Sequence, residues 1–384
     1  MRQLQLPAFE FTEEQKEFRR EVRSFLQAEK EKGTFDTQAD SWMSGYSEEF
    51  SKKLGAKGWI GITFPKEYGG QARSSIDRYI VTEELLAFGA PVASHWFADR
   101  QSGPLLLKFG TEEQKEFFIP KIAKGECYFS IGLSEPNSGS DLASLKTSAE
   151  KVDGGWMVNG MKTWTSGAHH SHYMITLCRT SPQDPKNRHG GMSQLIIDLK
   201  SDGVTIRPIQ FLTGEHHFNE VFLENVFVPD NRVVGDVGNG WAQGLTELSF
   251  ERSGPERILS TFPLLEEAIR ILKEKEDHRG LMEASKLVSR MWSLRNMSIG
   301  IASLLEEKKD VNLAAALVKD LGNSFEQHVA EVIRLLLPVM PNKHGEDVYA
   351  RLLAESILHG PGFTIRGGTT EILRGIIAKG VISA

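Results

Sequence analysis

The sequence contains little cysteine and no long apolar run. Its 384 residues include two cysteines, Cys127 and Cys178, which form neither a CxxC pair nor a spacing typical of zinc ligands. So few thiols argue against a disulfide scaffold and favour a reducing compartment. No stretch of about 18 apolar residues occurs, so we expect no membrane span. The first residues lack the apolar core of a signal peptide, and the expected location is therefore cytoplasmic.

An excess of positive charge is also missing. The formal net charge is −6 and the pI is about 6.0, so the chain has no general attraction for nucleic acid or an anionic membrane. We therefore expect no nucleic-acid partner, while local basic pockets for a phosphorylated ligand remain compatible with this balance. No GxGxxG pattern follows a predicted strand, which leaves a nicotinamide site of the Rossmann type without support.

The order of predicted elements divides the chain into three parts. Residues 1–125 are predicted to be helical, and they begin with a capping box at Thr12–Gln15. Residues 126–237 alternate short β-branched and aromatic runs with turn residues, and Asp153–Gly155 is typical of a hairpin, so a compact β-sandwich or barrel is expected. Residues 238–384 contain long amphipathic segments typical of an antiparallel helical bundle. The predicted fold class is therefore α+β.

Three stretches of the sequence carry a family resemblance. They are Gly132-Leu-Ser-Glu-Pro-Asn-Ser-Gly-Ser-Asp141, Asn159-Gly-Met-Lys-Thr-Trp-Thr-Ser-Gly167 and Ile365-Arg-Gly-Gly-Thr-Thr-Glu-Ile-Leu-Arg374. In this order and at these distances they resemble the acyl-CoA dehydrogenase family, over nearly the whole chain. The resemblance implies an N-terminal all-α domain, a middle β-barrel or sandwich domain and a C-terminal antiparallel helical bundle, with a flavin between the last two. The implied activity is FAD-dependent oxidation of the Cα–Cβ bond of an acyl-CoA thioester.

The resemblance also assigns residues to the cofactor. The matching positions are Leu133 and Ser134 beside the isoalloxazine ring, Trp164 and Ser166 packed against it or bonded to it, Ser140 at the flavin or the ligand phosphates, and Thr369 and Glu371 at the adenosine half. These residue types suit such a site, because a flavin needs an apolar wall and hydrogen-bond donors. Without the resemblance, a core tryptophan and a simple Gly/Ser/Asn turn would be the preferred interpretations.

The implied reaction requires a carboxylate that removes the α-proton of the thioester. Many members of the resembled family carry this base in a Glu-Gly-Thr sequence before the last helix, but the aligned position here is Gly367. A minority place it in a Glu-Arg pair on the first long helix of the bundle, which matches Glu251 and Arg252. We expect Glu251 to be the base, with a pKa raised by burial, and Arg252 to orient it or to bind substrate. The alternative is a pair of exposed helix charges.

Two departures from the family pattern leave the assembly open. Many members carry an Arg-x-x-Phe-Gly motif through which a neighbouring subunit grips the flavin diphosphate, and His278–Leu281 is only a poor match to it. The glycine-rich loop before the last segment is shortened to His359–Phe363. The implied partners are an electron-transferring flavoprotein and further subunits, in a homodimer, a homotetramer or a heteromer with a related chain. Two other hypotheses remain, a non-catalytic subunit that completes a flavin site, and an oxidase or desulfinase chemistry on the same fold.

Other polar side chains have ordinary interpretations beside functional ones. His169, His170 and His172 follow the second stretch, and such imidazoles could bind a metal or a coenzyme A phosphate. No Asp, Glu or Cys stands at ligand spacing from them, so a surface loop is favoured and no metal site is expected. Glu135 precedes a proline in the first stretch and is expected to be structural.

Overall fold

The computed structural model describes residues 4–244 and 254–382. The chain forms two compact units, each assembled from segments that are distant in the sequence. The helical unit combines Met1–Gly45, Arg73–Val92 and Glu251–Ala384, and the sheet unit combines Tyr46–Ala72 and Ala93–Phe250, as far as these ranges are described. The three-domain division with boundaries after residues 125 and 237 stays a prediction.

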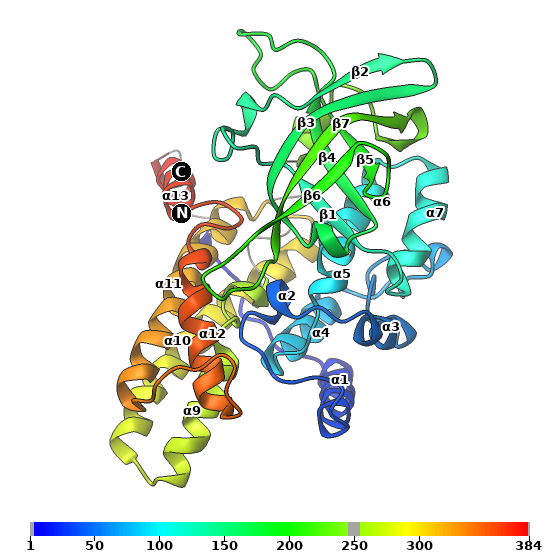
Figure 1. Ribbon diagram of the computed structural model, residues 1–384. Coiled ribbons are helices and arrows are strands. Elements are labelled where there is room, and N and C mark those ends of the chain that lie inside the picture. The colour runs from blue at the N-terminus through cyan, green and yellow to red at the C-terminus, as the bar shows by residue number, and fades with distance from the viewer. Residues whose placement is uncertain (1–3, 245–253, 383–384) are drawn as a thin grey trace. The chain divides into compact units, whose positions relative to one another are not determined.

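The sheet unit is built on one sheet of eight described strands (Figure 1). The strands are β1 (Phe129–Gly132), β2 (Ser148–Val152), β3 (Gly155–Ser166), β4 (Tyr173–Arg179), β5 (Met192–Asp198), β6 (Val204–Ile209), β7 (Phe218–Pro229) and β8 (Val233–Val234). Their hydrogen-bonded order is β6-β7-β3-β2-β4-β5-β8, and β1 pairs in parallel with β4 off this path. The predicted hairpin is present between β2 and β3, where Gly154 takes a φ of 72°, a left-handed conformation that glycine adopts without steric cost.

The apolar core of the sheet unit lies against β3, β4, β5 and β7. Strands β4 and β5 are buried over nearly their whole length. Helix α7 (Glu112–Ala123) covers part of the sheet through Phe118, whose ring makes edge-to-face contacts with Phe129 and Tyr173. This packing fixes β1, the strand from which the first family stretch begins.

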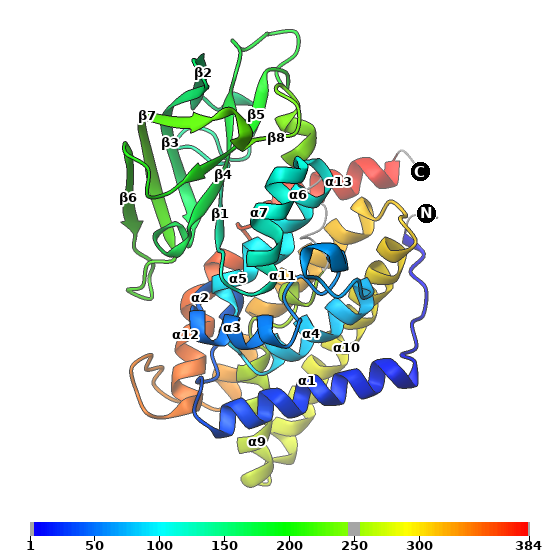
Figure 2. The same cartoon turned by 90° about the vertical axis from the view of Figure 1, so that its right-hand side faces the viewer.

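The other helical segments of the sheet unit are short (Figure 2). They are α3 (Glu48–Ala56), α5 (Ala93–Phe97), the π-helical segment η3 (Ala98–Ser102) and α6 (Gly103–Phe109), with the 3-10 turns η2 (Lys66–Tyr68), η4 (Leu142–Ser144), η5 (Ala168–His170) and η6 (Asp230–Arg232). The sequence does not predict the π-helical segment, because no simple residue pattern marks the extra residue that it accommodates.

Most helices of the helical unit are longer than those of the sheet unit. They are α1 (Glu13–Glu31), α2 (Ser41–Ser44), α4 (Ser75–Ala87), the 3-10 turn η7 (Pro255–Arg257), α9 (Phe262–Glu274), α10 (His278–Glu306), α11 (Asn312–Leu336), α12 (Val348–Phe363) and α13 (Thr370–Ile382). Helix α11 packs against α9, α10, α12 and α13, and it is buried along most of its length. The predicted capping box of α1 is confirmed, because Thr12 Oγ1 accepts from the amide of Gln15, whose side chain accepts from the amide of Thr12.

Buried charges connect three of these helices. Glu83 and Glu84 of α4 are buried, and Arg19 of α1 donates to both carboxylates. Arg295 of α10 binds Glu83 with two nitrogens, and Arg23 of α1 binds Glu84 in the same way. A buried carboxylate is costly unless it is paired, so these contacts hold α1 and α10 against α4.

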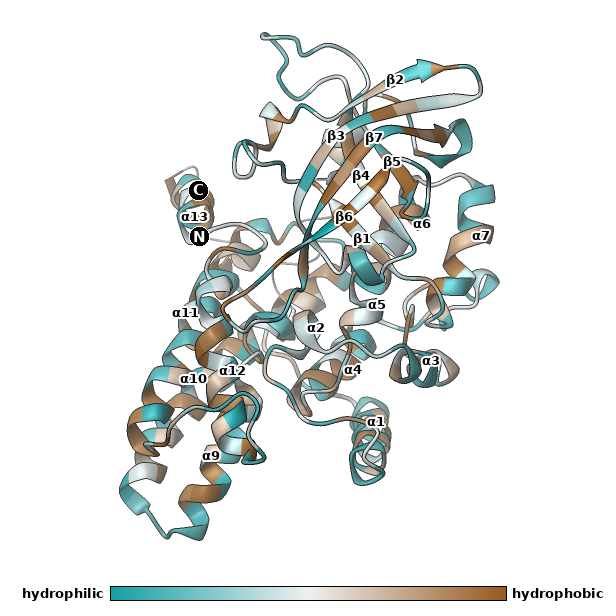
Figure 3. Ribbon diagram, in the orientation of Figure 1, coloured by the Kyte–Doolittle hydropathy of each residue, from teal (hydrophilic) through white to brown (hydrophobic). Residues whose placement is uncertain are grey.

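The hydropathy of each element follows its packing. Figure 3 shows many apolar residues along the strands at the centre of the sheet, a largely hydrophilic β2, and a mixture of apolar and polar residues along the helices of the bundle, as expected for buried central strands and amphipathic helices. None of the helices in the described part of the chain combines the length and the apolar character that a membrane crossing requires.

Candidate functional site

The first family stretch forms a tight loop directly after β1. The amide of Glu135 donates to the carbonyl of Ser138 at 2.9 Å, and the amide of Ser138 donates back to the carbonyl of Glu135 at 3.0 Å. Leu133 and Ser134 precede this turn and are half-buried, whereas Ser140 follows it and is exposed. We call residues 133–141 the β1 loop.

Trp164 leaves the sheet in a local irregularity of β3. The register between β3 and β7 shifts between Lys162 and Thr165, and Trp164 takes a φ of 57°. A left-handed conformation is rare for a bulky residue and costs about 1–2 kcal/mol. The indole remains 56% exposed, and the ring of Phe218 meets it edge-on with centroids 5.9 Å apart. The strained backbone thus accompanies a large aromatic side chain that is exposed outside the core. Strained backbone and exposed apolar surface are both frequent at ligand sites.

The β1 loop and this bulge are hydrogen-bonded to each other. The amide of Thr163 donates to the carbonyl of Ser134 at 2.9 Å, and Lys162 Nζ donates to the carbonyl of Leu133 at 3.2 Å. The structure therefore holds Leu133 and Ser134 of the first stretch beside Lys162 and Thr163, the residues that precede Trp164 in the second stretch.

This arrangement fits the ring of a flavin. The exposed indole of Trp164 can serve as the apolar wall, and the half-buried hydroxyls of Ser134 and Ser166 are donors of the kind that such a ring requires. The adjacent Thr165 hydroxyl is buried and has no hydrogen-bond partner within residues 4–244 and 254–382.

The third stretch surrounds the start of α13 in the helical unit. Thr369 Oγ1 accepts from the amide of Ile372 at 3.4 Å, and the neighbouring Glu371 is exposed. Backbone hydrogen bonding and the Thr369 hydroxyl lower the pKa of Glu371, so it is an anion at neutral pH. Both residues assigned to the adenosine half of the cofactor are therefore on the first turn of one helix.

Gly367 cannot be exchanged easily for a residue with a side chain. Its φ is 64°, in the left-handed region. A Cβ atom at this position would lie 3.1 Å from Arg257 Nη2 and 3.5 Å from Lys319 Nζ. Lys319 is buried and donates to the carbonyls of Arg366 and Gly368, each at 2.6 Å. The place where many family members carry the base thus has no carboxylate and faces two cations.

A buried polar cluster holds the segment before Gly367. Arg366 donates to both oxygens of Asp40, at 2.7 and 2.8 Å, and His359 Nδ1 lies 3.1 Å from the same carboxylate. Burial alone would raise the pKa of Asp40, but the charge of Arg366 and the contact with His359 lower it well below its usual range. Ser260 and Glu326 complete this set, which we call the Asp40 cluster.

Glu326 is the unusual member of the Asp40 cluster. Its Oε1 accepts from the amide of Ser260 at 2.7 Å, and its side chain is fully buried. Burial raises the pKa of Glu326 to about 7, and the nearby charge of Arg366 offsets only part of this effect. The sequence did not predict this cluster, because Asp40 is more than 200 residues away from every other member and no pattern near Asp40 or Glu326 marks a partner.

The predicted base, Glu251, and its neighbour Arg252 lie outside the described residues. A second Glu-Arg pair, Glu256 and Arg257, follows five residues later, and both of its side chains are buried. The guanidinium of Arg257 lies 5.0 Å from the centroid of the Trp42 ring, a cation–π contact. The repetition of Glu-Arg five residues later is the sequence signal that could have identified this second pair.

His169 and His170, which follow the second stretch, belong to a group of closely packed rings that are tilted against one another. The ring centroid of His169 lies 3.8 Å from that of His170 and 3.9 Å from that of His216, and Tyr46 stacks on His170. Burial and the neighbouring imidazoles lower the pKa of His169 to about 4. Within the described residues, the rings of His169, His170 and His216 do not form a group of three possible metal-ligand atoms within 4.8 Å of one another.

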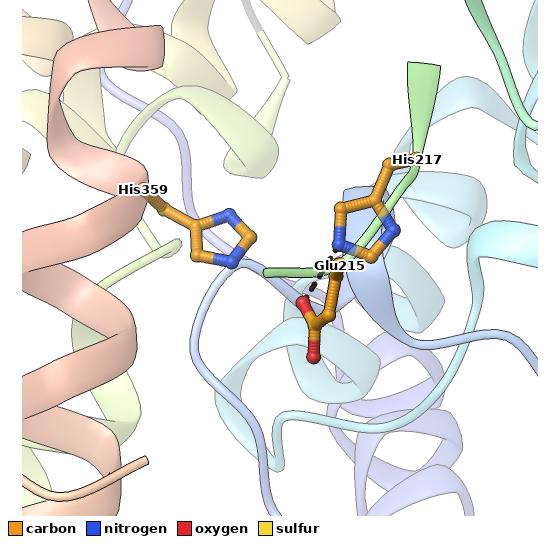
Figure 4. A group of neighbouring side chains, drawn as sticks. All are labelled: Glu215, His217 and His359. Atoms are coloured by element: carbon orange, nitrogen blue, oxygen red, sulfur yellow. Dashed lines mark hydrogen bonds and ion pairs between the residues drawn. The ribbon is translucent and has the colours of Figure 1, made fainter. Parts of the chain in front are cut away.

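The adjacent loop before β7 has a separate pair, in which His217 Nε2 lies 2.9 Å from Glu215 Oε2 (Figure 4). This contact joins two residues of the same loop and is separate from the ring contacts of His169.

Comparison with known proteins gives the family. The models "Acyl-CoA dehydrogenase, N-terminal domain" and "Acyl-CoA dehydrogenase, middle domain" match residues 12–126 and 130–226. Acyl-CoA dehydrogenase IpdE1 of Mycobacterium tuberculosis is 32% identical over 383 residues, which cover 95% of this chain and 97% of that protein. Acyl-CoA dehydrogenase FadE34 of the same organism is 33% identical over 339 residues and 85% of this chain, and the chain spans 45% of its length.

Solved structures agree with the described fold. A structure named "Tcur3481-Tcur3483 steroid ACAD" is 27% identical, with a TM-score of 0.87 and 98% of each chain covered. The ChsE4-ChsE5 complex from Mycobacterium tuberculosis is also 27% identical, with a TM-score of 0.84 and coverage of 98% of this chain and 99% of that chain. The predicted order of a helical region, a β-sheet region and a C-terminal bundle is confirmed, and with it the predicted family: this chain belongs to the acyl-CoA dehydrogenases.

Proposed function

We propose that this protein uses FAD to oxidise the Cα–Cβ bond of an acyl-CoA thioester, giving the 2-enoyl-CoA. The observation that carries the proposal is the strained, exposed Trp164, which hydrogen bonds from its neighbours hold beside Leu133 and Ser134. Membership of a family that is typically FAD-dependent supports the same cofactor. Bound FAD would supply the acceptor for the hydride that leaves Cβ.

Each predicted cofactor residue has a role in this proposal. Trp164 forms a wall of the ring site, and the hydroxyls of Ser134 and Ser166 donate to the ring edge, while Leu133 packs beside it. Ser140, exposed at the end of the β1 loop, contacts a phosphate of the cofactor or the ligand. Thr369 and Glu371, on the first turn of α13, hold the adenosine half of the cofactor.

Glu251 is the proposed base that takes the α-proton of the thioester. Support comes from Gly367, which has no side chain and lies beside Arg257 and Lys319, so the more common base position is not in use. A carboxylate that works as a base at neutral pH needs a raised pKa and an apolar, closed surrounding. Arg252 is proposed to orient Glu251 or to bind the substrate, and both residues lie outside the described part of the chain.

The decisive experiment compares Glu251→Gln with Glu256→Gln. The purified protein should show the absorption of oxidised flavin, and acyl-CoA should bleach it within one turnover. Glu251→Gln should keep the flavin and lose the bleaching rate by about 10²- to 10⁴-fold, the usual contribution of a general base. If Glu256→Gln keeps the flavin but loses the bleaching while Glu251→Gln reacts normally, the base is the buried Glu256 and the assignment to Glu251 is wrong.

A second candidate function is that of one subunit in a heteromeric dehydrogenase. It is favoured by two of the solved structures compared above, the Tcur3481-Tcur3483 steroid ACAD and the ChsE4-ChsE5 complex, which each pair two different names. The substrate would then be a coenzyme A thioester with a bulky steroid-derived acyl group. A chain that purifies without flavin and takes up FAD only with a related second chain would support this candidate over a homodimer or homotetramer.

The electron acceptor separates the remaining chemistries. We propose an electron-transferring flavoprotein as the partner that reoxidises the flavin. An oxidase would instead consume oxygen at the rate of substrate oxidation, and a desulfinase would leave the flavin oxidised when acyl-CoA thioesters are added. Measuring oxygen uptake with and without the flavoprotein partner distinguishes these outcomes.

A further inference from the structure

One buried ion pair links the β1 loop to the bulge of β3. Lys162 Nζ lies 2.8 Å from Glu135 Oε1, and the side chain of Lys162 is 0% exposed. Both residues belong to the family stretches, but the cofactor contacts assigned above do not include them. The sequence alone identified Glu135 only as a structural residue.

Both partners also form hydrogen bonds with backbone groups. The carboxylate of Glu135 accepts from the amides of Lys146 at 2.6 Å and Thr147 at 2.9 Å, in addition to Lys162. Lys162 Nζ donates to the carbonyl of Leu133 as well as to Glu135. The pair therefore connects the start of the β1 loop, and the segment at residues 146–147 that follows η4, to a single position on β3.

The aliphatic part of the Lys162 side chain also lies close to Gly132, the last residue of β1. A Cβ atom on Gly132 would lie 3.3 Å from Lys162 Cγ and 2.8 Å from Met174 Sδ. The Met174 side chain would have to move to accept this atom and the lysine stem would have to shift slightly, so Lys162 and β4 both pack closely against Gly132. The lysine thus passes closely over the strand end from which Leu133 and Ser134 extend.

Three consecutive residues of β3, 162–164, each contribute to the geometry of the site. Lys162 holds the carbonyl of Leu133, the amide of Thr163 holds the carbonyl of Ser134, and Trp164 then leaves the ladder with its indole exposed. The backbone strain at Trp164 persists only if the surroundings fix it. The contacts of Lys162 and Thr163 are the described contacts that join this position to the β1 loop.

A buried charge pair is an expensive way to stabilise a fold. Burial lowers the pKa of Lys162, against the attraction of Glu135, and in Glu135 the charge of Lys162 and the two amides outweigh burial and lower the pKa. Apolar residues of similar volume often stabilise a core as well as a buried ion pair does. A requirement for one defined loop geometry explains why such a pair is placed here.

We propose that Lys162 and Glu135 are the positioning residues of the flavin-ring site, which fix the β1 loop against the Trp164 bulge. This inference rests on the proposed function, because it assumes that FAD binds between Leu133, Ser134 and Trp164. Neither residue touches the reacting atoms in this proposal. Their effect is to preorganise the cofactor site before FAD arrives.

The test measures FAD affinity of the flavin-free protein for Lys162→Met, Glu135→Gln and a matched control, Gln114→Met. Gln114 is also buried in the sheet unit and donates to two carbonyls, Asn231 at 2.8 Å and Val233 at 2.7 Å, so its described hydrogen bonds hold a segment other than the β1 loop. Thermal unfolding of each apoprotein gives the loss of stability. Amide hydrogen exchange at Lys146, Thr147 and Thr163 reports loop order without any cofactor.

We expect Lys162→Met to weaken FAD binding about ten-fold or more, which is the scale of leaving buried polar partners unpaired. It should also accelerate exchange of the three amides. Gln114→Met should lose comparable thermal stability and keep the wild-type dissociation constant. A Lys162→Met protein with wild-type affinity for FAD, or a control that loses as much affinity, would show that the pair is merely structural. A wild-type chain that binds no FAD, either alone or together with a related second chain, would instead refute the proposed function.

Discussion

The raised pKa of Glu326 predicts a specific dependence of stability on pH. Glu326 lies on α11 with its carboxyl group buried in the Asp40 cluster, and Glu326→Gln removes the titration while keeping an oxygen that can accept from the amide of Ser260. In the folded protein, burial raises the pKa of this group from 4.5 to about 7. The unfolded chain exposes the group and restores the ordinary value.

The sign follows from proton binding. Between about pH 4.5 and pH 7 the folded protein keeps a proton on Glu326 that the unfolded chain has released, so the free energy of unfolding falls as the pH rises. The contribution is complete below the unfolded pKa and lost once the pH passes the folded pKa. One pKa unit corresponds to 1.36 kcal/mol, so the shift amounts to about 3 kcal/mol.

The assay is denaturant unfolding of wild type and Glu326→Gln at intervals from pH 4.5 to pH 8. The variant should gain about 3 kcal/mol relative to wild type over this range. Glu331→Gln, an exposed change on the same helix, should show no such gain. A difference between wild type and Glu326→Gln that stays constant with pH would mean that Glu326 is ionised throughout, and the reasoning from burial would fail.

Two further predictions concern the same region. Asp40→Asn keeps a residue that tolerates the φ of 54° found there but leaves Arg366 without its buried anion, and it should lower the free energy of unfolding by about 3–5 kcal/mol, measured by denaturant titration; a loss as small as that of an exposed Asp36→Asn would contradict this. Gly367→Glu should be more stable than Gly367→Gln at pH 7, because Arg257 lies within reach of the new carboxylate, with the gap closing in thermal melts below about pH 4; a more stable Gln variant would refute the cationic character of this position.

Local sequence signals predicted local structure well. The capping box at Thr12 and the turn at Gly154 are confirmed, because each depends on a hydrogen bond or a conformation within a few residues. The motif resemblance likewise identified Trp164, but its strained conformation has no signature in the sequence, because it depends on the pairing of β3 with β7. Local patterns therefore located the candidate site without describing its geometry.

Long-range contacts escaped prediction. The contact between Asp40 and Arg366 joins residues that are 326 positions apart, and no pattern near either residue announces the other. The interleaving of the two units was missed for the same reason, since helical segments from both ends of the chain pack together around Arg73–Val92. The role of Glu251 stays a prediction, and the second Glu-Arg pair shows that sequence position alone does not choose between the two carboxylates.

The interleaving has a consequence for biosynthesis. The described part of the sheet unit ends at residue 244, so its segments leave the ribosome well before the chain is finished, whereas the described part of the helical unit extends to residue 382. At a translation rate of about 5–20 residues per second, Asp40 waits roughly 16–65 s for Arg366 to be synthesised. For that interval the N-terminal helices exist without the partners that bury them, so the nascent chain exposes apolar surface that the folded chain covers.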